Sequence, residues 1–303
     1  GSLIGLQALT FAAAPQVAGR MLLRALAAPS RQLINNQGGS LLTQGTLNIN
    51  GGDVVNNGSW QGQQILLNAR QLTNNGAIQS ADALQLILAD RLDAGAGSKI
   101  SANGTAALQA LTLTNQGEWI ARNLTLRGDT LNNNGAVTGV EALTIGLNGA
   151  LTQQQDKTLL SAGRLTLQSS SLNNAGRVQG GDLHITTGAV DNNGRLQGDN
   201  SLLVNAGGRI TNGGNGAMIT QNALTLTGPE LFNYGLIQGN GNGVATITGL
   251  TQNDGRWLSG GAQTLNTPQL NNNGWLQASQ LILNATNASN NGTLLADGQG
   301  TLT

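Results

Sequence analysis

The sequence predicts an all-β protein, a parallel β-helix of about fourteen coils, and three observations support this prediction. An apolar residue recurs at intervals of about 20 residues, in most units two places after the glycine of an Asn-Asn-x-Gly motif. Between these positions, apolar and polar residues alternate with a period of two. Aromatic residues make up only 2% of the chain, which is too few for an ordinary globular core of this length.

The recurring apolar positions, called slots below, start after Ser30 and continue to the end of the chain. They are Leu42, Trp60, Ile78, Ile100, Trp119, Val137, Leu160, Val178, Leu196, Ile219, Ile237, Trp257, Leu276 and Leu294. A repeat of this length indicates a solenoid, because each unit is too short to bury its apolar face alone and must stack on its neighbours.

Each unit contains two further apolar stations. Five or six residues after the slot comes a Leu-x-Leu pair, such as Leu183 and Ile185, and a single apolar residue such as Leu72 precedes the asparagines. The period of two predicts strands rather than helices. Three short strands per unit fit one coil in which each strand pairs with its equivalent about 4.8 Å away in the next coil. The narrow tube that results favours Leu, Ile and Val over aromatic residues.

The Asn-x-Gly pattern predicts a recurring corner. In ten of the units Asn lies four residues before the slot, at Asn56, Asn74, Asn115, Asn133, Asn174, Asn192, Asn233, Asn253, Asn272 and Asn290. Gly lies two before it, at Gly58, Gly76, Gly117, Gly135, Gly176, Gly194, Gly235, Gly255, Gly274 and Gly292. We expect the asparagines to stack as an amide ladder, and the glycines to supply positive φ. This structural interpretation is favoured over a catalytic or ligand-binding one.

Every third corner is longer, and the slots that follow these corners are Leu42, Ile100, Leu160 and Ile219. The intervals between them (100 − 42, 160 − 100 and 219 − 160) are nearly equal, so a triplet of coils repeats. One interpretation is duplication with tolerated loop insertions. The other is a row of protruding loops that a partner contacts, and the candidate contact residues are then Asp93, Gly97, Gln154, Asp156, Asn212 and Asn215.

The four tryptophans divide into two kinds. Trp60, Trp119 and Trp257 occupy slots, so we expect them in the core. Trp275 follows Gly274 directly and is expected on the surface near Leu236. There it is either a candidate contact residue in a small apolar patch or an ordinary surface residue.

Composition excludes several functional classes. The 14 basic and 14 acidic residues cancel, which removes the electrostatic basis for binding nucleic acid or an anionic membrane. No apolar run is long enough to span a membrane, so we expect no membrane insertion. The chain has no cysteine, which excludes disulfides and thiolate metal sites.

A search for chemistry finds no convergent site, so we expect no enzyme activity, no catalytic residue, no cofactor and no metal. The single histidine, His184, lies at an outward position of its strand next to Asp182, where other coils carry threonine. Asp90 and Asp93 flank Arg91 and are interpreted as a solvated corner. A polysaccharide-acting β-helix enzyme would need a cluster of acids, which is missing. A flat threonine face for ice or glycan binding would need two regular threonine columns, and only one interrupted column is present.

The two ends of the chain differ from the repeat. Residues 1–32 are expected to form a cap or transition segment with a short amphipathic helix over 15–29, and Gly1-Ser2 reads as a tag remnant. Residues 33–303 form the predicted repeat domain. Because the pattern stops without a cap, we expect the natural protein to continue past the C-terminus.

The repeat resembles that of filamentous haemagglutinin. The stretches LNNAGRVQGGDLHI, LTNNGAIQSADALQL and LNNNGAVTGVEALTI carry the resemblance, which covers residues 33–303. It implies a right-handed β-helix and a very large Gram-negative exoprotein exported by two-partner secretion through an outer-membrane transporter. Members of this kind are adhesins, haemolysins or contact-dependent growth inhibition effectors that deliver a toxin.

Taken with the missing acid cluster, the resemblance predicts a structural shaft. It would be secreted to the bacterial cell surface as a monomer and would project adhesive, receptor-binding or toxin domains. The alternative is an adhesin segment that binds a cell-surface receptor or glycan directly through the wider corners. The flanking sequence of the full-length protein would distinguish an adhesin from a toxin-bearing effector.

Overall fold

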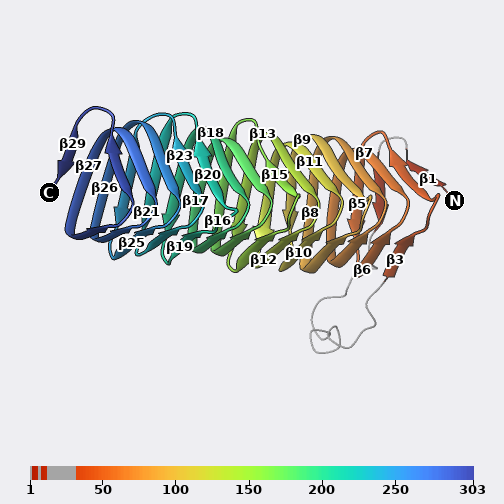
Figure 1. Ribbon diagram of the computed structural model, residues 1–303. Helices are drawn as coiled ribbons and strands as arrows, with labels where there is room; N and C mark the ends of the chain where they lie inside the picture. Colours follow the sequence, from red (N-terminus) through yellow and green to blue (C-terminus); the bar gives the residue numbers. More distant parts are fainter. Residues whose placement is uncertain (1, 6–7, 12–31) are drawn as a thin grey trace, which may run out of the picture. The chain divides into compact units, whose positions relative to one another are not determined.

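The alternating pattern of apolar and polar residues forms strands throughout the part of the chain that the structure describes. The computed structural model describes residues 2–5, 8–11 and 32–303, and these residues form 29 β-strands and no helix. The chain divides into two units, Gly1–Leu131 and Asn132–Thr303. Each unit is a parallel β-solenoid, and the described residues make about fourteen turns (Figure 1).

Most coils of the first unit are made of short strands, and two strands are long enough to continue through the corners of a coil. The strands are β1 (Ser2–Gly5), β2 (Ala8–Phe11), β3 (Gln32–Asn35), β4 (Ser40–Thr43), β5 (Thr46–Asn50), β6 (Asp53–Asn56), β7 (Ser59–Asn74), β8 (Ala77–Ala94), β9 (Lys99–Gln109), β10 (Thr112–Asn115) and β11 (Glu118–Gly128). Strand β12 (Thr130–Asn133) includes the boundary between the units.

The second unit has the same organisation. Its strands are β13 (Ala136–Leu147), β14 (Ala150–Gln153), β15 (Thr158–Leu160), β16 (Arg164–Asn174), β17 (Arg177–Asn192), β18 (Arg195–Ala206), β19 (Ile210–Asn212), β20 (Ala217–Thr220), β21 (Ala223–Gly228), β22 (Leu231–Asn233), β23 (Leu236–Gly239), β24 (Gly243–Ile247), β25 (Leu250–Asn253), β26 (Arg256–Asn272), β27 (Trp275–Asn290), β28 (Thr293–Ala296) and β29 (Gly300–Leu302).

Adjacent coils pair in parallel with like residues opposite each other. Strand β17 pairs with β16 on one side and β18 on the other, and the three lie side by side in Figure 1. This pairing places Leu165, Leu183 and Leu202 in one buried column. Because successive side chains of a strand point to opposite faces, such columns form the core while the residues between them face solvent.

Three of the slots lie one residue earlier than the sequence pattern suggested. The residues that pair with the neighbouring slots and are buried are Leu41, Leu159 and Met218, not Leu42, Leu160 and Ile219. In strands a shift of one residue exchanges the buried and exposed faces, so counting from a motif is unreliable where the corner has a different length. With Ile100 as the fourth slot, the three triplet intervals (100 − 41, 159 − 100 and 218 − 159) are identical.

The three tryptophans expected in the core are buried. Trp60, Trp119 and Trp257 have no exposed surface and their indole N–H groups lack a hydrogen-bond partner in the described part of the chain. Their rings fill the tube at the expense of one unsatisfied donor each.

The first described residues extend the solenoid. Strand β1 pairs with β4 and β2 pairs with β5, so a coil precedes the one that begins at β3. The short helix expected over 15–29 lies outside the described residues. No helix in the described part of the chain is long and apolar enough to cross a membrane.

Candidate functional site

The asparagines of successive corners form a buried amide ladder. In the second unit each Nδ2 donates to the Oδ1 of the next coil at 2.7–2.8 Å, in the order Asn174, Asn192, Asn212, Asn233, Asn253, Asn272 and Asn290. In the first unit the same bonds join Asn35, Asn56 and Asn74 at 2.8 Å. Apart from Asn35 at 7% and the exposed Asn290, these side chains are fully buried.

Each ladder amide also holds the backbone of its own corner and of the next one. Asn174 Nδ2 lies 3.3 Å from the carbonyl oxygen of Arg195, and its Oδ1 accepts the N–H of Gly176 at 3.2 Å. Asn115 and Asn133 accept the N–H of Gly117 and Gly135 in the same way. The ladder therefore satisfies polar backbone groups that a corner would otherwise bury without partners.

Two residues break the ladder. Ala94 occupies the ladder position between Asn74 and Asn115 and carries no amide. At the next long corner Gln153 accepts from Asn133 at 2.8 Å, but its own Nε2 is buried without a partner. The extra methylene of glutamine carries its amide nitrogen away from Asn174, the residue opposite it in the next coil.

The corner glycines are required for a different reason from the one predicted. The glycines with positive φ in the described residues are Gly38 and Gly97, which lie in the long corners. At Gly58, Gly76 and Gly194, a Cβ would lie closer than 3.0 Å to a carbonyl oxygen of the preceding coil. Glycine is therefore needed for the close approach of stacked backbones.

Each long corner contains a four-residue turn that the regular corners lack. The segments Asn36–Gly39, Gly95–Ser98, Gln154–Lys157 and Gly213–Gly216 are each closed by a hydrogen bond of 2.8–3.2 Å from the fourth N–H to the first carbonyl. The third residue has a positive φ in three of them, at Gly38, Gly97 and Asp156. Each turn directly follows the ladder residue, which makes the corner two residues longer than the regular one.

Most of the candidate contact residues lie at exposed turns, but two do not. Gly97, Gln154, Asp156 and Asn215 are exposed. Asp93 is half-buried and lies in β8 just before its turn. Asn212, expected in a contact loop, is fully buried because it is a member of the ladder.

The outward column that carries Trp275 also contains Leu236 and Arg256. Trp275 is 39% exposed, and its indole donates to Gln277 at 3.1 Å. Arg256 pairs in register with both neighbours, so it separates Trp275 from Leu236. The small apolar patch expected from these two residues is therefore interrupted by a charge.

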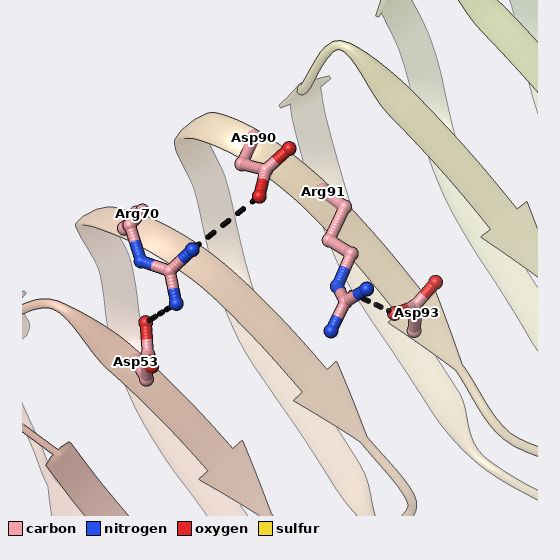
Figure 2. Close-up of polar contacts among 5 residues, drawn as sticks. All are labelled: Asp53, Arg70, Asp90, Arg91 and Asp93. Atoms are coloured by element: carbon pink, nitrogen blue, oxygen red, sulfur yellow. Dashed lines mark hydrogen bonds and ion pairs between the residues drawn. The ribbon is translucent and has the colours of Figure 1, made fainter.

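A network of charged residues links successive coils of the first unit. Figure 2 shows Arg70 between Asp53 and Asp90, at 2.5 and 3.4 Å, and Arg91 beside Asp93 at 3.1 Å. Hydrogen bonding to Asp53 is the main cause of the raised pKa of Arg70. Arg70 links Asp53 and Asp90 across neighbouring coils at an exposed edge, whereas Arg91 and Asp93 pair within strand β8.

The single histidine does not form a catalytic group with its neighbours. Ser201 Oγ donates to Asp182 Oδ1 at 2.6 Å and Asn200 donates to the same oxygen at 3.0 Å. These two hydrogen bonds lower the pKa of Asp182. His184 lies in the predicted outward column with Thr166 and Leu203. In a serine triad the hydroxyl donates to histidine, whereas here it donates to the carboxylate.

The described residues contain no group of three or more acids, histidines or cysteines that could hold a metal ion. Two open cavities of about 560 and 500 Å³ lie on the second unit. The first is lined mainly by Thr and Asn and contains no titratable side chain. The second lies between two long corners and is lined by charged residues.

Comparison with known proteins gives a consistent result. The chain is 43% identical over 270 residues to the tRNA nuclease CdiA of Escherichia coli (strain NC101) and 44% identical over 270 residues to the 16S rRNA endonuclease CdiA of Enterobacter cloacae. In both cases the match covers 89% of this chain and 8% of the relative. The chain is homologous to the repeat region of CdiA proteins. A deoxyribonuclease CdiA of Dickeya dadantii is 35% identical over 200 residues, which are 66% of this chain and 6% of that protein.

The CdiA relatives are thus matched over only a small part of their length. Their names assign them three different nuclease activities, although they share this segment. No family model matches the chain, and no solved structure matches it.

Proposed function

We propose that this chain is part of the shaft of a CdiA-type exoprotein on the surface of a Gram-negative bacterium. The shaft projects receptor-binding, adhesive or toxin domains for contact-dependent growth inhibition or adhesion. The observation that carries the proposal is that relatives named for acting on tRNA, 16S rRNA and DNA share this segment. A segment common to proteins with different nuclease activities does not determine which nucleic acid is cut.

The structure supports a mechanical role. The inward positions are used for the core and the ladder, and several outward charged groups pair across coils, as Arg70 does with Asp53 and Lys99 with Glu118. Such a solenoid gains length by adding coils, since each coil contacts only its neighbours. We infer that the length of the segment is the property its function requires and that the segment has no enzyme activity of its own.

The finer features of the proposal come from the filamentous haemagglutinin resemblance and the CdiA relatives. The exoprotein passes the outer membrane through its two-partner secretion transporter, and the coils are wound in the right-handed sense. The segment acts as a monomer, and its repeat domain comprises residues 33–303 together with the strands β1 and β2, which pair with β4 and β5. A receptor or glycan on a target cell is contacted by other parts of the exoprotein, or by the long corners.

Deletion of coils from the full-length exoprotein tests the shaft role. Removing residues 159–217, which form one complete triplet, should preserve secretion. Contact-dependent inhibition of target cells should be retained and only partly reduced. Deleting residues 159–208 instead should abolish surface display, because the coil register is lost. Complete loss of inhibition in a triplet deletion that is displayed normally would show that the segment does more than span distance.

The absence of enzyme activity can be tested with the 303-residue chain itself. We expect no turnover of tRNA, ribosomal RNA, DNA or polygalacturonate. Turnover that disappears in Asp182→Asn or His184→Ala would show that the outward face of β17 is catalytic and would overturn this part of the proposal.

A further inference from the structure

The cavity between two long corners of the second unit is here called the saddle. Asp156 and Lys157 lie on one of its walls and Asn215 on the other, and it has a volume of about 500 Å³. Between the walls lie two regular corners, of which Gly176 and Gly194 form the floor. Since the regular corners lack the four-residue turn, the two long corners rise on either side of them.

Three cations face this cavity. Arg177 and Arg195 are exposed and lie opposite each other in adjacent coils, about 4.8 Å apart along the sheet. Lys157 is on the wall of the same cavity, and Asp156 is the single acid there. The described residues contain no ion pair to Arg177 or Arg195, and the guanidinium of Arg195 donates a hydrogen bond to Gln197. Like charges in register destabilise a sheet, so folding does not explain this pair.

The first triplet provides an internal comparison. Between its long corners, the residues at the positions of Arg177 and Arg195 are Ser59 and Ala77. The cation that follows there, Lys99, is neutralised by Glu118 at 3.3 Å. The same architecture therefore exists without the cationic pair, which shows that the arginines are not needed to form the corners.

We propose that the saddle binds an anionic glycan, with Arg177 and Arg195 holding its carboxylate or phosphate groups. Arginine presents a planar set of donors that matches both anions in bidentate geometry. Thr158 and Asn215 line the same cavity and offer a hydroxyl and an amide to sugar hydroxyl groups. This binding goes beyond the shaft role and does not depend on it.

Other anionic partners fit less well. No aromatic side chain lines the saddle, so it lacks the stacking surfaces used for single-stranded nucleic acid and the apolar anchors common in protein interfaces. Strands β15, β17 and β18 are paired on both sides, which leaves no free edge for an added peptide strand.

The test measures binding to the 303-residue chain by calorimetry with four probes: oligogalacturonate, phosphorylated dextran, neutral dextran and polyglutamate. We expect saturable binding of at least one anionic glycan, no binding of dextran, and at least roughly tenfold weaker binding of polyglutamate. Equal or tighter binding of polyglutamate would identify an acidic peptide site instead. Failure of both anionic glycans to bind would overturn the proposal.

The decisive variant replaces the two arginines by the residues found at the same positions of the first triplet. Arg177→Ser combined with Arg195→Ala should weaken glycan binding roughly tenfold or more, and Asp156→Asn should strengthen it. The matched control replaces two exposed arginines of the first unit, Arg122→Ser with Arg127→Ser, and changes the net charge by the same amount. This control should leave the affinity for the glycan within about twofold of the parent.

The folding of the variants separates this proposal from the shaft role. The Arg177 and Arg195 variant should melt at the same temperature as the parent or higher, because a repulsion is removed. Loss of binding with retained folding supports the saddle as a site and leaves the shaft role unaffected. Unchanged binding in the folded double variant would overturn the site.

Discussion

At the scale of single residues, asparagine is the side chain that continues the ladder from one coil to the next. Asparagine donates to the next coil and accepts from the previous one, as Asn212 does with Asn192 and Asn233. Gln153, at the same position of the preceding long corner, accepts from Asn133 but leaves its own amide nitrogen buried without a partner. An unsatisfied buried donor costs about 1–3 kcal/mol, so this corner is a local weak point.

Gln153→Asn should therefore stabilise the protein. The shorter side chain would allow donation to Asn174 and should raise the free energy of unfolding by about 1 kcal/mol, or the melting temperature by about 2 °C. Asn212→Gln is the reciprocal control and should destabilise by a similar amount. Chemical denaturation of both variants checks the prediction, and a change of the same sign in both would contradict it.

Asp182 gives the molecule a pH-dependent contribution of known sign. Hydrogen bonds from Ser201 and Asn200 lower its folded-state pKa, so its stabilising contribution is complete above the ordinary aspartate pKa and is lost as pH falls through the lowered value. At neutral pH, Asp182→Asn should be less stable than the parent. The difference should shrink toward zero under acid conditions. Thermal melts from pH 7 to pH 2 test this, and a constant difference would refute it.

At the scale of the element, corner shape depends on how closely stacked backbones approach. A Cβ at Gly76 would meet the carbonyl oxygen of Gly58 in the previous coil, whereas a Cβ at Gly146 would meet nothing within 4 Å. The two glycines thus differ in the space around them. Neither of them is among the described glycines with positive φ.

Gly76→Ala should cost about 2 kcal/mol or more, because either the methyl group or the neighbouring backbone must move in a packed stack. Gly146→Ala should be neutral or slightly stabilising, since alanine loses less backbone entropy on folding. Denaturant midpoints of the two variants make the comparison. Equal losses of stability in the two variants would mean that both positions depend on the backbone flexibility of glycine rather than on the space around the missing side chain.

At the scale of the whole molecule, the unit of repetition is the triplet of coils rather than the single coil. Slots Leu41, Ile100, Leu159 and Met218 are evenly spaced along the chain, and each follows a long corner. In a solenoid, coils interact mainly with their nearest neighbours, so stability is approximately a sum of coil and interface terms. A deletion that keeps equivalent residues adjacent should consequently be accepted.

Deleting residues 159–217 joins Thr158 to Met218 and should give a folded protein with an unchanged β-type circular dichroism spectrum. The join is acceptable because Ala217, which normally precedes Met218, and Thr158 occupy equivalent positions in their coils.

The matched control deletes residues 159–208 and joins Thr158 to Arg209, which places an exposed arginine at the buried slot position of Leu159. This deletion should give an aggregated or unfolded product, since the buried and exposed faces no longer match. Sedimentation and circular dichroism of the two proteins make the comparison. A folded product from both deletions would contradict the importance of register.

The sequence by itself determined the solenoid, its approximate coil number and most members of the asparagine ladder. These features recur along the chain. A pattern such as that of Leu183 and Ile185 can be recognised in the sequence because most coils carry it, even where a single coil deviates. The pairing of each coil with its neighbour then follows from the need to bury one apolar face.

Only the tertiary structure decided what happens where the repeat is irregular. The one-residue shift to Leu159, the burial of Asn212 and the close contacts that require glycine at Gly76 all depend on what the preceding coil places opposite them. The saddle has the same origin, since Arg177 and Arg195 become neighbours through stacking and not through sequence proximity. A single repeat specifies its own strands, but contacts between repeats depend on register, which a residue count across a corner of variable length does not determine.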